Sequence, residues 1–190
     1  MITFFVLWAV AQAVLYVGGD LRVLLFFDQL AFMTGLGIAW AFLLFAKRFP
    51  YSSGSLNRFI VLVFTLLTLI SFALMVFDVS PATKQIGTTY IAPFEHNSLF
   101  LIFVLITFVG IFLYAYSIFW QKYLSSSGDT RELIKYVFFS SLIPVIAGAT
   151  LNILFVLLGF FNFFIYSPIF TLIFTFSVAY LLVRSRSSHQ

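Results

Sequence analysis

Apolar residues are arranged along this chain in six long runs, and short polar segments separate the runs. Each run holds, or nearly holds, the roughly 20 apolar residues that a helix needs to cross about 30 Å of hydrocarbon. The runs are too long for barrel strands and do not alternate polar with apolar positions. The pattern therefore predicts six membrane-spanning helices, at about residues 2–17, 23–46, 58–77, 98–121, 133–158 and 160–183.

Prolines interrupt the last two runs. Pro144 lies in the first half of the fifth run, and Pro168 lies in the sixth. Proline removes a backbone hydrogen-bond donor and strains the preceding turn, so we expect helix kinks at both positions. The fifth run, of roughly 26 residues and about 39 Å, would need a kink or a tilt to fit the bilayer.

The composition leads to the same fold class. Hydrophobic residues make up 63% of the 190-residue chain and charged residues only 8%, whereas soluble domains carry about 25% charged residues. Apolar surface must therefore face lipid. We expect an all-α, polytopic transmembrane helical bundle that forms one domain over residues 1–190 and ends in a cytoplasmic tail at 184–190.

Basic residues concentrate in alternate connections between the runs. The connections after the second and fourth runs, together with the tail, hold eight Lys and Arg residues, while all other connections hold two. The positive-inside rule places the basic connections in the cytoplasm, and six crossings then put both termini there as well. Because these residues sit in short loops rather than along an amphipathic element, the net charge of +4 indicates no nucleic-acid partner. The lipid bilayer is the expected partner.

The long outer connection before the fourth run contains the segment QIGTTYIAP at residues 85–93. Its β-branched and aromatic residues favour extended structure. We expect a small extended excursion at the outer membrane surface.

Catalytic and metal-binding motifs are missing from the sequence. The chain has no cysteine, which excludes disulfides, zinc–thiolate sites and iron–sulfur clusters. It has no GxSxG, Walker-type or HExxH motif. Its four lysines all fall in loops or at helix edges, so no buried lysine is expected to hold retinal. We predict no cofactor, no metal and no enzymatic activity.

Polar residues near or within the runs are the candidates for lining a ligand cavity. They are Gln12, Asp28, Thr150 and Asn152. Hydrogen bonding between helices is the alternative role for most neutral polar residues in such runs. Interfacial capping is the alternative for Asp28, at the predicted start of the second helix. Glycines at 35, 37 and 148 predict close approach of neighbouring helices.

Several segments, taken in order, resemble a known membrane region. The polar helix start TRELIKYVFF leads into IPVIAGATLN, and a tight turn then precedes YSPIFTLIFTFSVAYLLVRSR. The earlier LAFMTGLGIAWAFLLFAKRFP ends in a basic inner loop with proline. This order resembles the seven-transmembrane (7TM) sensor region at the amino terminus of some bacterial histidine kinases. The resemblance implies perception of a ligand or membrane state, passed down the last helix to a cytoplasmic output module.

The chain departs from that family in two respects. It has six predicted helices instead of seven, as if the first were absent, and no kinase, PAS or cyclase module follows. It is expected to be either a fragment or a stand-alone protein. The hypothesis is thus a non-enzymatic sensor of the inner (cytoplasmic) membrane, binding a small apolar or amphipathic molecule and acting on a separate cytoplasmic partner or as a homo-oligomer. The alternatives are a small transporter or channel-like protein for an apolar substrate, and an accessory subunit of a membrane complex.

Overall fold

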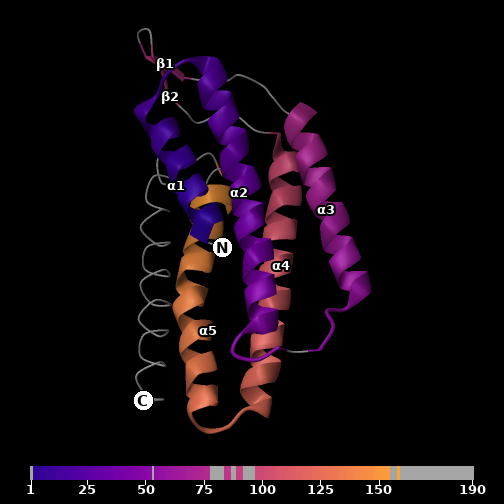
Figure 1. Ribbon diagram of the computed structural model, residues 1–190. Coiled ribbons are helices and arrows are strands. Elements are labelled where there is room, and N and C mark those ends of the chain that lie inside the picture. The colour runs from indigo at the N-terminus through magenta and orange to yellow at the C-terminus, as the bar shows by residue number, and fades with distance from the viewer. Residues whose placement is uncertain are drawn as a thin grey trace.

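The computed structural model describes residues 2–52, 54–77, 84–86, 89–91, 97–154 and 158 (Figure 1). The predicted sixth helix at 160–183, Pro168 and the tail at 184–190 lie outside these residues. The prediction of six helices and the location of the chain ends therefore stay predictions.

Five α-helices form the described bundle, and each runs antiparallel to the next (Figure 1). They are α1 (Ile2–Val17), α2 (Leu21–Arg48), α3 (Arg58–Phe77), α4 (Ser98–Ser125) and α5 (Gly128–Ala149). The helices α2 to α5 are long and apolar enough to cross a membrane, while α1 is shorter. By length and composition the chain is a multi-pass helical membrane protein.

Two helices are longer than the apolar runs that predicted them. Helices α2 and α4 each have 28 residues and so are about 42 Å long. Lys47, Arg48 and Lys122 therefore lie within helices and not in loops. A helix satisfies its backbone groups in hydrocarbon and at the polar interface alike, so a change in side-chain polarity does not end it.

Helix α5 differs from its prediction at both ends. It begins at Gly128, which has a φ of 57° that glycine tolerates. It ends as an α-helix at Ala149, and the π-helix η1 (Thr150–Leu154) follows. Pro144 lies inside α5 and is buried. The chain therefore changes its helical hydrogen-bonding pattern just beyond the proline, before the predicted end at 158.

The N-terminal caps of α2 and α4 come from acidic or amide side chains. Asp20 accepts a hydrogen bond from the backbone N–H of Arg22 at 2.9 Å, and Asn97 accepts one from Leu99 at the same distance. Asp28 lies two turns inside α2 and is partly buried. The capping role considered for Asp28 is therefore wrong, because Asp20 fills it.

The main core contains buried residues of α1, α2, α4 and α5, and a group of aromatic rings packs between α2 and α4. The ring of Phe42, almost fully buried, contacts three rings of α4, with centroid distances of 5.1 Å to Phe112, 5.5 Å to Tyr116 and 5.7 Å to Phe119. Tyr116 also donates a hydrogen bond of 3.2 Å to Ser141 of α5. Helix α4 thus contacts α2 on one side and α5 on another.

Glycines allow α1 and α3 to pack closely on this core. A Cβ atom at Gly37 would lie 2.7 Å from the Phe4 ring of α1, and one at Gly110 would lie 2.7 Å from the Phe64 ring of α3. Close approach at Gly37 is therefore confirmed, and Gly110 is a contact that the sequence analysis missed. At Gly35 and Gly148 no described atom lies within 4 Å of that point.

The connection between α3 and α4 contains a small antiparallel hairpin. Strand β1 (Lys84–Ile86) pairs with β2 (Thr89–Ile91), with Gln85 opposite Tyr90. This confirms the extended excursion predicted from QIGTTYIAP.

Candidate functional site

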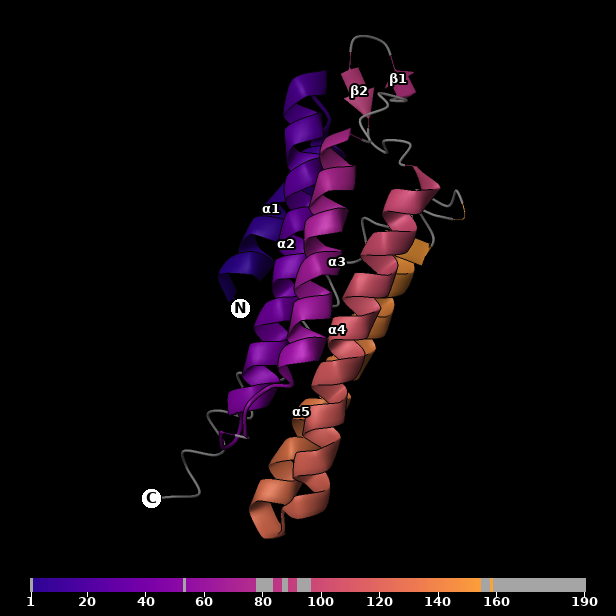
Figure 2. The same ribbon diagram turned by 90° about the vertical axis from the view of Figure 1, so that its right-hand side faces the viewer.

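The connections of the bundle separate into two ends. The α2–α3 and α4–α5 connections lie together at one end, and the α1–α2 turn and the β hairpin lie at the other (Figures 1 and 2). We call the first the basic end, because it carries Lys47, Arg48, Arg58, Lys122, Arg131 and Lys135. The two basic connections predicted to share one side of the membrane therefore do share one end of the molecule.

Lys122, in the last turn of α4, is buried at the basic end with 3% of its surface exposed. Its ammonium nitrogen donates hydrogen bonds to four backbone carbonyls at the end of α2 and in the following loop. The acceptors, at 2.7–2.8 Å, are Ala46, Lys47, Phe49 and Tyr51. We call these carbonyls and the ammonium the Lys122 cradle.

The cradle meets a requirement of every helix end. The last carbonyls of a helix have no partner within it, and their partial negative charge favours a nearby cation. Ala46 and Lys47 are two such residues of α2. An ammonium offers three N–H donors, so its hydrogens are shared among the four carbonyls. The Lys122 side chain of α4 thereby satisfies the unpaired carbonyls at the end of α2.

The expectation that no lysine is buried is wrong, and the sequence holds a signal that would have shown it. Ile111, Ala115 and Ile118 are all buried on α4. Lys122 continues their spacing of three or four residues, which places it on the same face of the helix. Its position at the edge of an apolar run concealed this.

Tyr51 connects the Lys122 cradle to the α4–α5 connection through hydrogen bonds. Its phenol oxygen lies 3.2 Å from the hydroxyl of Ser125 and 3.0 Å from that of Ser126. Its ring lies 5.1 Å from the ammonium of Lys122, within cation–π range. The hydrogen bonds from Ser125 and then Ser126 lower the pKa of Tyr51 below its usual 10.0.

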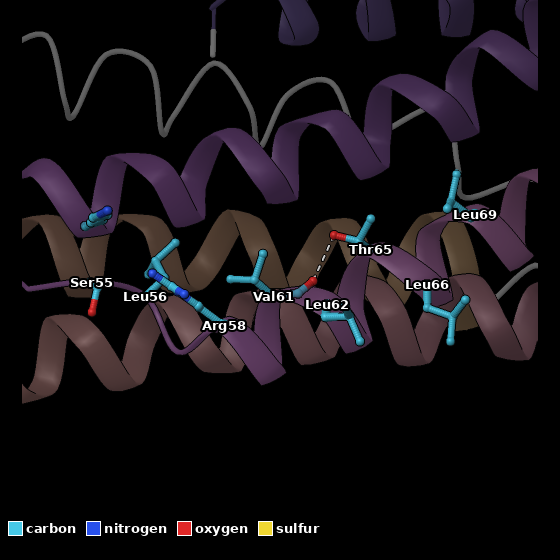
Figure 3. Close-up of a pocket in the computed structure, with 9 residues that line it drawn as sticks. Ser55, Leu56, Arg58, Val61, Leu62, Thr65, Leu66 and Leu69 are labelled. Atoms are coloured by element: carbon cyan, nitrogen blue, oxygen red, sulfur yellow. Dashed lines mark hydrogen bonds between the residues drawn. The ribbon is translucent and has the colours of Figure 1, made fainter.

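A groove of about 660 Å³ lies along α3 and reaches the basic end (Figure 3). Its α3 residues recur at helical spacing and so share one face. We call it the α3 groove, and its lining consists of Lys47, Ser55, Leu56, Arg58, Val61, Leu62, Thr65, Leu66 and Leu69.

The wall of the α3 groove is apolar apart from its end. Leu62, Leu66 and Leu69 are between 55% and 64% exposed. The hydroxyl of Thr65 donates to the Val61 carbonyl at 2.8 Å, so its polar group is satisfied within α3 (Figure 3). The two cations, Lys47 and Arg58, come from α2 and α3 and both belong to the basic end.

Lys47 belongs to both features. Lys47 is one of the residues that line the α3 groove, and its backbone carbonyl accepts a 2.8 Å hydrogen bond from the ammonium of Lys122. A molecule that contacts this residue in the groove would therefore act on a backbone segment that α4 holds directly.

The residues predicted to line a cavity do not line the α3 groove. Gln12 is buried in α1, and its side-chain oxygen has no hydrogen-bond partner among the described residues. Asp28 lies on α2, and Thr150 begins η1 and is partly buried. The side chain of Asn152 lies outside the description. These residues stay predictions for a separate cavity.

No known protein family, curated protein or solved structure matches this chain. The resemblance to the histidine kinase sensor region therefore stays a prediction.

Proposed function

We propose that this chain is a membrane sensor domain without enzymatic activity. An amphipathic molecule enters the α3 groove, and its presence is transmitted through the basic end to a separate cytoplasmic partner. The observation that carries the proposal is the double position of Lys47, in the groove wall and in the Lys122 cradle.

The basic end faces the cytoplasm in this proposal. It gathers six of the chain's ten Lys and Arg residues, and Arg22 and Lys84 belong to the other end. Cytoplasmic connections carry the excess of such residues. A signal reaching this end therefore arrives on the side where an output partner would be.

Four hydroxyl groups of the described interior argue against passage of a polar solute. The hydroxyls of Thr34, Thr68, Ser71 and Thr107 each donate to a carbonyl of their own helix. Since these donors are already used, they offer a polar solute little along the bundle axis. The opening of the α3 groove lies instead on a face where leucines are exposed, which suits a molecule arriving from the lipid.

Transmission of the signal requires that the end of α2 and the loop after it contact both α4 and the α4–α5 connection. The cradle joins the groove residue Lys47 to α4, and Tyr51 joins the same loop to Ser125 and Ser126, directly before α5. A shift of the end of α2 would change the hydrogen bonds at both points. Pro144 and η1 farther along α5 are positions where a helix bends most readily.

A tethered alkyl chain tests this function without assuming any headgroup. The chain has no cysteine, so a Thr65→Cys variant can be modified at one site with a decyl methanethiosulfonate. We expect the decyl group to fill the α3 groove and change amide hydrogen exchange both at residues 49–57 and at 123–128. In a Lys122→Met background, only the change at 49–57 should persist.

The matched control is Leu113→Cys, because Leu113 of α4 is 64% exposed and lies outside the groove. The same decyl group there should alter neither segment. If Lys122→Met does not fold, Tyr51→Phe, which loses only the phenol contacts, replaces it and should weaken the change at 123–128. Equal changes at 123–128 with and without these substitutions would contradict transmission through the cradle.

A further inference from the structure

We infer that the α3 groove binds one anionic phospholipid from the leaflet at the basic end. Its phosphate lies between Lys47 and Arg58, and one acyl chain follows Leu62, Leu66 and Leu69. This inference rests on the proposed function, because it names the class of molecule that occupies the groove.

The length of the groove matches one leaflet. Its α3 residues run from Arg58 to Leu69, which corresponds to about 16 Å along a helix. The hydrocarbon core is about 30 Å thick, so this is close to the depth of a single leaflet. An acyl chain that starts from a headgroup at the basic end would end near the last leucine.

The charges of the groove match a lipid phosphate. Arg58 presents a planar guanidinium that binds phosphate through two parallel hydrogen bonds, and Lys47 adds a second cation from the neighbouring helix. Figure 3 shows the guanidinium end of Arg58 directed toward Leu56 and Ser55, at the end of the groove. Basic pockets between membrane helices on the cytoplasmic side are typical sites for anionic headgroups.

The exposed leucines of the α3 groove favour a lipid over a free phosphate ion as its ligand. A soluble phosphate ion would contact only the basic end and would gain nothing from the exposed side chains at positions 62, 66 and 69. An amphiphile with a hydrocarbon chain uses both parts of the groove. The volume of about 660 Å³ lies within the roughly 300–1,000 Å³ of sites for small molecules.

Lipid titration followed by native mass spectrometry tests the inference on the full chain in neutral detergent. The probes are phosphatidylglycerol, phosphatidylcholine and inorganic phosphate. We expect one phosphatidylglycerol to bind about twenty-five-fold more tightly than phosphatidylcholine, since each of two cations contributes roughly fivefold. Lys47→Gln with Arg58→Gln should abolish the preference, and inorganic phosphate should not displace the lipid.

Arg48→Gln with Lys135→Gln is the matched control, because it removes two exposed cations of the same end that do not line the groove. This variant should keep the preference. Leu66→Trp, which fills the groove, should weaken phosphatidylglycerol binding while the cations remain. Equal binding of the two lipids, equal loss in both double variants, unchanged binding in Leu66→Trp, or displacement by inorganic phosphate would each overturn the inference.

The two proposals can fail separately. The decyl chain tethered at residue 65 carries no headgroup, so hydrogen exchange can respond to it even if the protein shows no preference among lipids. In that case only the lipid class is wrong. If phosphatidylglycerol binds selectively and the tethered chain leaves residues 123–128 unchanged, the groove binds lipid without the proposed transmission.

Discussion

Helix α2 meets α4 and α3 in very different ways. Toward α4 it presents Phe42 among three aromatic rings, and the Lys122 cradle closes its end. Toward α3 a 3.1 Å hydrogen bond from the Trp40 indole to Thr68 is the described side-chain link, and the α3 groove lies beside it. A membrane bundle can therefore pack one pair of helices through buried rings and leave a neighbouring pair open to lipid.

Lys122→Met should weaken the α2–α4 contact most. It removes the three N–H donors that four carbonyls share, and at about 1.5 kcal/mol for each charge-assisted hydrogen bond the free energy of unfolding should fall by about 4.5 kcal/mol. Reversible unfolding in mixed micelles measures this value. Lys135→Met, at an exposed position of α5, should change it by less than about 0.5 kcal/mol; similar losses in the two variants would contradict the cradle.

Phe42→Ala should have the next largest effect. Loss of the contacts between its ring and the rings of α4 should reduce the free energy of unfolding by about 3 kcal/mol. This value is at the low end of the range for buried phenylalanines, because lipid is itself apolar. Leu66→Ala, on the open side of α3, should cost less than about 0.5 kcal/mol. The same unfolding experiment compares them, and a larger loss for Leu66→Ala would reverse the contrast between the two sides.

Alanine substitutions at two glycines should change the free energy of unfolding by smaller amounts and in opposite directions. An alanine at Gly110 would place its Cβ 2.7 Å from the Phe64 ring, which should push α3 from α4 and cost about 1 kcal/mol of unfolding free energy. Gly35→Ala meets no described atom within 4 Å and should gain up to about 1 kcal/mol through helix propensity. Thermal unfolding of both variants tests this, and equal shifts would mean that α3 does not pack at Gly110.

The pH dependence of Tyr51 should give the smallest effect. Its pKa is lowered from 10.0 by the hydroxyls of Ser125 and Ser126, so the folded state favours the phenolate. Stability should therefore rise as the pH increases through the folded-state pKa toward 10, and that gain is lost as the pH falls. The difference in unfolding free energy between wild type and Tyr51→Phe, measured from pH 7 to 10, should grow with pH; a shrinking difference would show that the phenol is favoured.

The sequence predicted the helices better than it predicted the site. The length of the apolar runs located α1 and α3 at their observed ends, because in lipid every apolar run of that length must satisfy its own backbone. They missed the ends of α2 and α4, where polar residues such as Lys47 and Lys122 continue the helix into the interface. The hairpin at 84–91 followed from β-branched residues between turn formers.

The features of the basic end depend on contacts between segments far apart in the chain. Lys122 finds its carbonyls more than 70 residues away, and only the register of α4 against α2 determines which ones. Gly110 of α4 lets the Phe64 ring of α3 approach closely, and the leucine face of α3 that lines the groove stays exposed. Neither the contact of Lys122 with α2 nor the packing of α3 on α4 can be predicted from a local sequence pattern. The sequence alone could therefore offer only polar residues within single runs as candidates.

The most direct test of the buried ammonium is ¹⁵N NMR of the lysine side chains in the solubilised protein. The chain has four lysines, at 47, 84, 122 and 135. We predict that Lys122 gives a side-chain ammonium signal whose protons exchange with water far more slowly than those of exposed Lys135, and that this signal disappears in Lys122→Met. Equally fast exchange at Lys122 and Lys135 would contradict the cradle and the transmission built on it.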